Sequence, residues 1–193
     1  MTNIVKLKKD KFFCHFLYYE FVLYSVGNKM KNVMRNISND EFEIKYNLFK
    51  PIIFNIAYSY LKNVSDCDDL VQDVFMKYLS SDEVFDTLDN EKYWLIRVTI
   101  NTCINCVKSP WKKVIIDNDI NYGVSEVDNS KEDMFNLVSS LPIKYKNIIV
   151  LYYYDDLSIK EISEALNISE SNVKKRLERA RNILRDKIKK VED

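Results

Sequence analysis

Apolar residues recur at helical spacing along the chain from Asp40 onward. The repeating set steps forward by three or four residues each time, and its members are Phe42, Tyr46, Phe49, Ile53, Ile56 and Tyr60. Because an α-helix makes one turn about every 3.6 residues, such a set lies on one face and predicts a long amphipathic helix over residues 40–60. Pro51 falls inside this pattern, so we expect the helix to bend or restart there.

Two more helices are predicted before residue 110. Ser65 and Asp68 form a capping pair at the start of the first one, whose acidic first turn suits the positive end of the helix dipole. Its buried stripe comprises Leu70 or Val71, Val74 or Phe75, and Tyr78. The second helix runs from about residue 91 to residue 108, and its inward side chains are Ile96, Ile100, Cys103 and Val107. Pro110 ends it, because proline cannot continue a helix.

The helical period is lost between residues 111 and 131, where Asn, Asp and Ser are frequent. This composition is typical of a linker. Helicity resumes near residue 132, and a helix that ends about Ser140 is followed by Leu141 and Pro142. Since proline suits the first turn of a helix, we expect this pair to restart the chain into residues 145–154.

Two short capped helices follow one another in the last third of the chain. Ser158 and Glu161 have the spacing of a capping box, and Leu157 can pack against Ile162 as a hydrophobic staple. Asn167 lies in the turn, where it is one of the few non-glycine residues that tolerates a left-handed backbone. Two helices joined by a tight turn form a helix-turn-helix, whose second helix normally enters the major groove of DNA.

The second of these helices has different chemistry on its two sides. Ser169 caps it, and the buried stripe is formed by Val173, Leu177, Ala180 and Leu184. The other side is cationic, because nine Lys or Arg residues occur from Lys174 to Lys190 against the two acidic residues Glu178 and Asp186. Such a surface can neutralise several DNA phosphates. A solvated charged helix in an ordinary bundle is the alternative interpretation.

Composition narrows the fold class. Two Gly and three Pro among 193 residues argue against a β-sandwich or a nucleotide-binding α/β fold, since both need glycine-rich turns. We therefore predict an all-α protein of two small helical domains joined by a flexible linker, with a C-terminal helix-turn-helix. The domains are residues 39–110 and 132–190, the linker is residues 111–131, and residues 1–38 are an extension of unclear role.

Charge is unevenly distributed, although the formal net charge is zero. Residues 1–38 carry +5 (7 basic, 2 acidic) and residues 39–109 carry −5 (7 basic, 12 acidic). Residues 110–140 carry −3 (3 basic, 6 acidic) and residues 141–193 carry +3 (12 basic, 9 acidic). Different parts of the chain are therefore expected to meet different partners.

Four cysteines and one histidine offer little for covalent chemistry. The cysteines do not suit a disulfide framework in a chain with this much apolar material, which favours a reducing, cytoplasmic location. Cys103 and Cys106 form a CxxC pair inside a helical pattern, and with His15 as the single histidine they do not complete a zinc site. We therefore expect no metal, no cofactor and no enzymatic activity, since no nucleophile and base are suitably spaced either.

The N-terminal extension is the least informative part of the chain. Residues 12–26 are aromatic and apolar, but His15 and Glu20 interrupt them, so the stretch is too short and too polar for a membrane span. The preceding lysines would suit a signal peptide, yet no small-residue cleavage site follows. A third interpretation is that translation begins at Met30 or Met34, which would make residues 1–29 an artefact or a loosely attached helix.

At these motifs the chain resembles the bacterial RNA polymerase sigma factors of the sigma-70 superfamily, in the two-domain extracytoplasmic-function (ECF) form. Residues 66–75, DCDDLVQDVF, resemble the family's signature of an acidic pair, Leu-Val-Gln, an acid and an aromatic residue. Trp94 to Asn101 resembles the segment that follows the promoter-melting loop. The family's C-terminal pattern is matched by Leu141-Pro142, Tyr145, Leu157-Ser158 with Glu161-Ile162, and Val173 to Arg181. The resemblance covers residues 40–110 and 132–188.

For the first domain, the resemblance implies binding to core RNA polymerase and to the melted −10 element. Asp69, Gln72 and Asp73 would bind the clamp helices of the β′ subunit, where their acidic surroundings give complementary charge. The residues that would hold the unstacked −10 strand are Tyr93, Trp94, Arg97 and Asn101. The chain departs from the family at Ile100, Asn105 and Cys106, so fewer positive charges face the DNA.

For the second domain, the resemblance implies recognition of the −35 element while the domain rests on the polymerase β flap. The positions that match the family's base-reading residues are Lys174, Lys175, Glu178 and Arg179. Lys and Arg can donate to guanine and Glu can accept from cytosine, so a G/C-containing −35 element is expected. Lys160, Arg176 and Arg181 are assigned to phosphates, which position the protein without specifying sequence. An anti-sigma factor is a further partner that the family allows.

The chain is therefore interpreted as a sigma factor that binds core RNA polymerase and directs promoter-specific transcription initiation through promoter DNA. Two alternatives stay open. An ordinary helix-turn-helix transcription regulator would bind a palindromic duplex site without polymerase, and a helical protein-interaction module would be insensitive to DNA.

Overall fold

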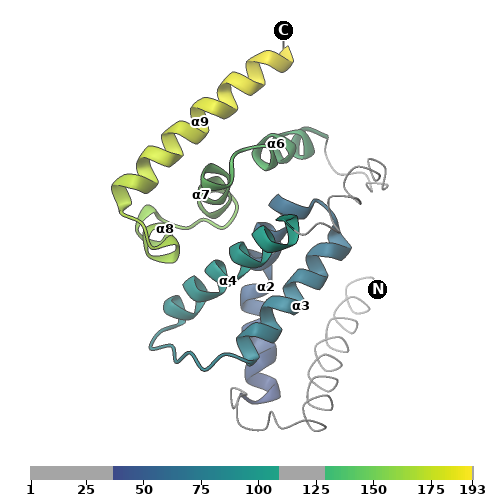
Figure 1. Ribbon diagram of the computed structural model, residues 1–193, viewed down its shortest axis with the longest axis vertical. Coiled ribbons are helices and arrows are strands. Elements are labelled where there is room, and N and C mark those ends of the chain that lie inside the picture. The colour runs from purple at the N-terminus through teal and green to yellow at the C-terminus, as the bar shows by residue number, and fades with distance from the viewer. Residues whose placement is uncertain (1–36, 109–128, 193) are drawn as a thin grey trace, which may run out of the picture. The chain divides into compact units, whose positions relative to one another are not determined.

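The computed structural model describes residues 37–108 and 129–192 (Figure 1). Within these ranges the regular secondary structure is entirely α-helical, which confirms the all-α prediction. The helices are α2 (Asn39–Leu61), α3 (Val64–Leu79), α4 (Leu88–Lys108), α6 (Asn129–Ser139), α7 (Ile143–Tyr153), α8 (Ile159–Leu166) and α9 (Glu170–Glu192). The N-terminal extension up to residue 36 and most of the predicted linker lie outside the described residues.

The predicted apolar stripes form the buried faces of α2 and α3. In α2, Phe42, Tyr46, Phe49, Ile53 and Ile56 are all at most 3% exposed. The same holds in α3 for Leu70, Val71, Val74, Phe75 and Tyr78, so both members of each predicted pair are buried. The restart considered at Pro51 is absent, because α2 continues through this residue as one helix.

Two helix starts differ from the prediction. Asn63, not Ser65, caps α3, since its side-chain Oδ1 accepts a hydrogen bond from the backbone N–H of Asp66 at 3.1 Å. α4 begins three residues earlier than predicted, because Thr87 Oγ1 accepts a hydrogen bond from the backbone N–H of Asn90 at 3.1 Å. Both caps satisfy donors that a helix N-terminus otherwise leaves without partners.

The chain divides into two compact units. One unit contains the N-terminal part of α2 up to Phe49 together with residues Phe75–Val84, and the other contains Lys50–Val74 and the described residues from Phe85 onward. In the first unit the aromatic rings of Phe42 and Tyr46 pack on Phe75, with centroid separations of 5.8 and 4.7 Å. The predicted boundaries of the two domains and their linker stay a prediction.

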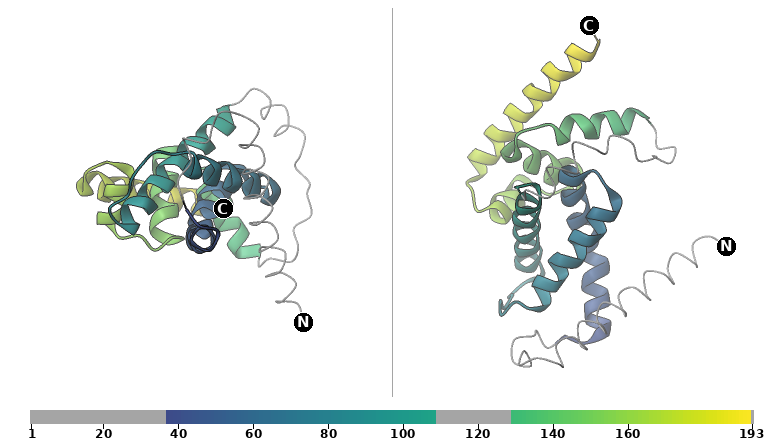
Figure 2. Two further views of the ribbon diagram at one scale, coloured as in Figure 1. Left: turned by 90° about the horizontal axis from the view of Figure 1, so that it is seen from below. Right: turned by 45° about the vertical axis from the view of Figure 1, so that its right-hand side comes forward.

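In the second unit, α7 is the central helix of the C-terminal part and contacts α6, α8 and α9 (Figures 1 and 2). Its residues Ile148, Ile149, Val150 and Leu151 are nearly or fully buried. Burial all around a short helix explains why the sequence shows no clear helical periodicity there. No helix in the two described ranges is long and apolar enough to cross a membrane.

Candidate nucleic-acid interface

The first helix of the predicted helix-turn-helix is fixed by a complete capping box. Ser158 Oγ accepts the backbone N–H of Glu161 at 3.2 Å, and Glu161 Oε2 accepts the backbone N–H of Ser158 at 2.9 Å. Leu157 and Ile162 flank the box and are 5% and 0% exposed, as a hydrophobic staple requires. The local sequence therefore specifies where α8 begins.

The turn between α8 and α9 has the predicted left-handed residue. Asn167 has φ 52° and ψ 50°, and the backbone N–H of Ile168 bonds the carbonyl of Ser163 at 3.0 Å. Ser169 Oγ then accepts the backbone N–H of Asn172 at 3.3 Å and caps α9. These contacts confirm the helix-turn-helix and set the direction in which α9 leaves the turn.

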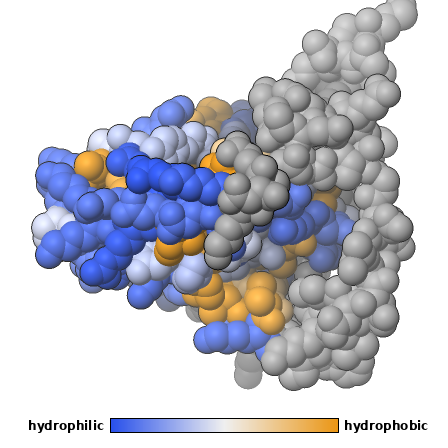
Figure 3. All heavy atoms as spheres, turned by 90° about the horizontal axis from the view of Figure 1, so that it is seen from above, coloured by the Kyte–Doolittle hydropathy of each residue, from blue (hydrophilic) through white to orange (hydrophobic). Residues whose placement is uncertain are grey.

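The two sides of α9 differ as the sequence predicts. Val173, Leu177 and Ala180 are at most 2% exposed, while Leu184 is half-buried. The four residues predicted to read bases, Lys174, Lys175, Glu178 and Arg179, are all exposed. Figure 3 shows that the described part of the face it draws is largely hydrophilic, with smaller hydrophobic patches. The structure thus presents these four side chains to solvent on a rigid helix, which is the arrangement that base recognition needs.

The residues predicted to bind phosphates are placed in three different ways. Lys160 is exposed, with its Nζ 3.9 Å from Glu164 on the next turn. Arg176 is half-buried, and its Nε donates to Asn172 Oδ1 at 2.9 Å. Arg181 donates from Nε to Tyr153 Oη at 2.8 Å. The arginines are therefore already oriented by neutral partners, which leaves their positive charge available to an anion.

Two tyrosines of α7 contact α9 and were not identified from the sequence as site residues. The guanidinium carbon of Arg181 lies 5.6 Å from the centroid of the Tyr153 ring, so Tyr153 both stacks on Arg181 and accepts its hydrogen bond. Desolvation raises the pKa of Tyr145, but the hydrogen bonds and positive charges of Arg179 and Lys144 together outweigh it, so the pKa is lowered. Tyr145 and Tyr153 thus position two of the predicted DNA-binding arginines.

On α3, the three residues predicted to bind core polymerase lie together. Asp69 and Asp73 are exposed and Gln72 is half-buried, and their spacing places them on one helix face. The neighbouring positions Leu70 and Val71 are buried, so the polar face is clearly separated from the core. This surface is acidic and accessible, as a docking site for a basic partner requires.

On α4, the residues predicted to hold the −10 strand separate into two groups. Tyr93 is only 5% exposed and belongs to the core, so it could reach a base only if it moved. Trp94 is half-buried, with its ring 5.7 Å from that of Phe85, and Asn101 is exposed. Arg97 donates from Nη1 to the backbone carbonyls of Ala165 at 3.1 Å and Glu164 at 3.4 Å. Trp94, Arg97 and Asn101 share one helix face.

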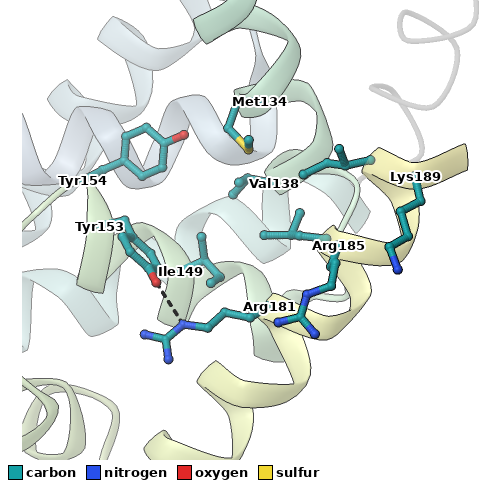
Figure 4. A pocket seen from close by; sticks show the side chains of 10 residues that line it. Met134, Val138, Ile149, Tyr153, Tyr154, Arg181, Arg185 and Lys189 are labelled. Carbon is teal, nitrogen blue, oxygen red and sulfur yellow. Dashed lines mark hydrogen bonds between the residues drawn. The ribbon is translucent and has the colours of Figure 1, made fainter. Parts of the chain in front are cut away.

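A cavity of about 510 Å³ lies between α6, α7 and α9 (Figure 4). Its apolar walls are formed by Met134, Val138, Ile149, Leu184 and Ile188, with Tyr153 and Tyr154 beside them. Arg181, Arg185 and Lys189 supply positive charge from α9. An apolar groove bordered by cations suits an amphipathic helix with acidic residues beside its apolar face. The sequence showed the exposed cations, but the groove depends on how three helices pack.

Family comparisons agree with this geometry. Residues 46–112 match the family described as Sigma-70 region 2, and residues 131–184 match the family described as Sigma-70, region 4. The first match contains α3 and α4, and the second contains the helix-turn-helix. The two sets of predicted site residues therefore fall into the two matched regions.

Three relatives from Bacillus subtilis (strain 168) cover most of the chain. RNA polymerase sigma factor SigV is 31% identical over 144 residues, which is 73% of this chain and 87% of SigV. ECF RNA polymerase sigma factor SigM is 30% identical over 149 residues, 72% of this chain and 90% of SigM. ECF RNA polymerase sigma factor SigW is 26% identical over 182 residues, 85% of this chain and 97% of SigW.

Two solved structures share the fold. One is the sigma factor RpoE in complex with the anti-sigma factor NepR from Bartonella quintana, with TM-score 0.60, 22% identity and coverage of 77% of this chain and 96% of that chain. The other is CnrH in complex with the cytosolic domain of CnrY, with TM-score 0.60, 19% identity and coverage of 79% and 90%. Together with the regional matches, these findings show that the chain belongs to the sigma-70 family as an ECF-type RNA polymerase sigma factor, which binds core polymerase and directs promoter-specific transcription initiation.

Proposed function

We propose that the two halves of the chain divide promoter recognition between them, with residues 39–110 acting on the −10 element and residues 132–190 on the −35 element. The observation that carries this proposal is the exposed cationic face of α9 in a fully capped helix-turn-helix. Tethering two modest binding sites raises the effective concentration of each, so neither site needs to bind tightly alone.

In the −35 element, Lys174, Lys175 and Arg179 donate to guanine O6 and N7, and Glu178 accepts from cytosine N4. These side chains extend from exposed positions of α9, and Tyr145 holds Arg179 in place. Lys160, Arg176 and Arg181 bind phosphates and fix the position of the helix in the groove. The expected −35 element therefore contains G/C pairs.

In the melted −10 element, Trp94 provides a stacking surface for an unpaired base, and Arg97 and Asn101 bind the strand beside it. Stacking on an aromatic ring contributes roughly 1–3 kcal/mol per base, so one such contact is enough to favour the open strand. Tyr93 does not stack on a base, because its side chain is buried. The cations on this face are few, so strand opening depends more on the promoter sequence than on charge.

Core polymerase is bound at two surfaces. Asp69, Gln72 and Asp73 bind the β′ clamp helices, and the groove between α6, α7 and α9 receives the β flap. The relatives in the two solved structures are held by NepR and by the cytosolic domain of CnrY. We infer that an anti-sigma factor can block this chain in the same manner by covering a polymerase-binding surface.

The chain contributes specificity and performs no covalent chemistry itself, and it acts in the cytoplasm, where core polymerase operates. Its recognition surfaces and the absence of a nucleophile–base pair in the sequence patterns both support this assignment. The polymerase active site carries out RNA synthesis.

Transcription in vitro tests the assignment of residues. Core polymerase, the full chain and a promoter library should give transcripts whose −35 preference changes at one base pair when Lys175 or Arg179 is replaced by alanine. Asp73→Lys should abolish transcription while leaving the helical circular dichroism unchanged, because Asp73 is exposed. If every α9 substitution lowers transcription equally from all promoters in the library, the base-reading assignment is wrong.

A further inference from the structure

In the second unit, α4 contacts α8, the first helix of the helix-turn-helix. Lys92 Nζ lies 3.0 Å from Glu161 Oε1 near the N-terminus of α8. Five residues further along α4, Arg97 Nη1 donates to the carbonyls of Ala165 and Glu164 near the C-terminus of α8. Two cations of α4 therefore bind the two ends of one short helix.

Both contacts are electrostatically favourable. Glu161 is held as a carboxylate, since its backbone hydrogen bond from Ser158, the Ser158 side chain and Lys92 together lower its pKa to about 2. The last carbonyls of a helix carry the negative end of its dipole, which attracts the Arg97 guanidinium. The Lys92 side chain is 23% exposed, so solvent screens its ion pair only in part.

The packing around this contact also contains poorly satisfied groups. Asn55 on α2 donates to Asp155 Oδ1 at 2.8 Å, but Asp155 Oδ2 is buried and has no hydrogen-bond partner among the described residues. Lys146 on α7 is 8% exposed; its Nζ lies over the Tyr60 ring at 4.6 Å, but burial and the positive charge of Lys62 both disfavour its own charge. Buried groups with incomplete partners lower the stability of the arrangement that contains them.

We propose that α8 is an intramolecular competitor of the −10 strand: it occupies Arg97 in the resting protein and must leave before single-stranded DNA can bind α4. The inference depends on the proposed role of Arg97 in the −10 element. The Glu161 carboxylate makes two contacts, since it completes the capping box of α8 and also pairs with Lys92 of α4. Release of α4 and release of α8 for duplex DNA are then one event.

The test is binding of the full chain to a fluorescent single-stranded −10 oligonucleotide, followed by anisotropy. Lys92→Glu places a like charge opposite Glu161 and should free α8. Lys45→Glu on α2 makes the same change in charge and is the matched control. Since an ion pair of this kind is worth up to about 1 kcal/mol, Lys92→Glu should bind DNA roughly two- to fivefold tighter. Lys45→Glu should bind equally or more weakly than the wild type.

The direction of the change separates the proposal from simple charge effects. Adding negative charge to a DNA-binding protein normally weakens binding, so tighter binding by Lys92→Glu requires that a competitor was removed. Adding Arg97→Ala to Lys92→Glu should abolish the gain. If Lys92→Glu binds DNA no more tightly than Lys45→Glu, the proposal is wrong.

Hydrogen exchange provides a second readout that does not depend on DNA. Amides of α8 should exchange faster in Lys92→Glu than in Lys45→Glu, and equal protection of α8 in both variants would also overturn the proposal. Transcription with core polymerase distinguishes failure of the proposed competition by α8 from failure of the proposed role of Arg97. If the wild-type chain supports promoter-specific transcription but Lys92→Glu shows neither effect, only the competition by α8 fails; if Arg97→Ala leaves −10 dependence intact, the proposed role of Arg97 fails.

Discussion

Lys146→Met should stabilise this protein, although it removes a charged residue from the first turn of α7. Lys146 is 8% exposed on α7, and its Nζ lies 4.6 Å from the centroid of the Tyr60 ring. Burial lowers the pKa of this ammonium to about 8, and the nearby charge of Lys62 acts in the same direction. The folded state therefore holds a cation in surroundings that disfavour it at neutral pH.

The size of the effect follows from this pKa. A lowering from 10.5 to about 8 corresponds to about 3 kcal/mol at neutral pH, because each pKa unit represents about 1.4 kcal/mol. Methionine fills nearly the same volume and keeps the apolar stem, but it loses the cation–ring contact with Tyr60, worth about 0.5–2 kcal/mol. The expected net gain in the free energy of unfolding is about 1–3 kcal/mol.

Urea unfolding of the full chain between pH 7 and pH 10.5 measures this gain. The folded pKa of Lys146 lies below its unfolded value, so the burial penalty is complete below about pH 8 and fades toward pH 10.5. The difference between Lys146→Met and the wild type should therefore shrink over this range. Lys144→Met, at an exposed position on the same helix, is the control and should change stability little. A Lys146→Met protein that is less stable than the wild type at pH 7, or a difference that stays constant across the range, would show that burial of the ammonium does not destabilise the fold.

Three further predictions concern the helix-turn-helix. Ser158→Ala removes the α8 cap and should lower the free energy of unfolding by about 1 kcal/mol in urea, whereas Ser163→Ala, inside the same helix, should have less effect. Arg179→Ala should reduce the binding free energy by about 1–3 kcal/mol at one −35 base pair. Lys160→Ala should instead lower the affinity for all DNA sequences alike and reduce the slope of log affinity against log salt by about one. Gel-shift titrations with holoenzyme measure both effects. The pKa of Glu161 is lowered from 4.5 to about 2, so its contacts stabilise the fold fully above pH 4.5 and are lost as the pH falls toward 2. In thermal melts, the stability of Glu161→Gln should not show this dependence on pH.

The helices were predictable because each carries a periodic apolar stripe, but their exact starts were not. Asn63 and Ser65 are both good capping residues two positions apart, so local chemistry does not choose between them. The choice depends on Lys62, whose left-handed backbone (φ 57°) ends α2 and places Asn63 at the start of α3. Thr87 is not distinguished by its sequence either, since it lies in a polar segment with several other candidate caps.

The helix-turn-helix was predictable in detail because its determinants are local. Ser158, Glu161 and Asn167 lie within ten residues of one another, and each acts on backbone groups at a fixed spacing. The contacts of Arg97 could not be predicted in this way. Its acceptors are backbone carbonyls about 68 residues further along the chain, and every residue type has such a carbonyl. The Tyr153–Arg181 contact is likewise set by how α7 packs on α9.

Transcription in vitro by core RNA polymerase, with and without this chain, shows whether the chain reads both promoter elements when the −10 and −35 elements are changed independently. The account predicts transcripts that require the chain and both elements, with weak binding of duplex DNA by the chain alone. Tight binding of the isolated chain to a palindromic duplex, with no promoter-specific transcript from the mixture, would contradict it.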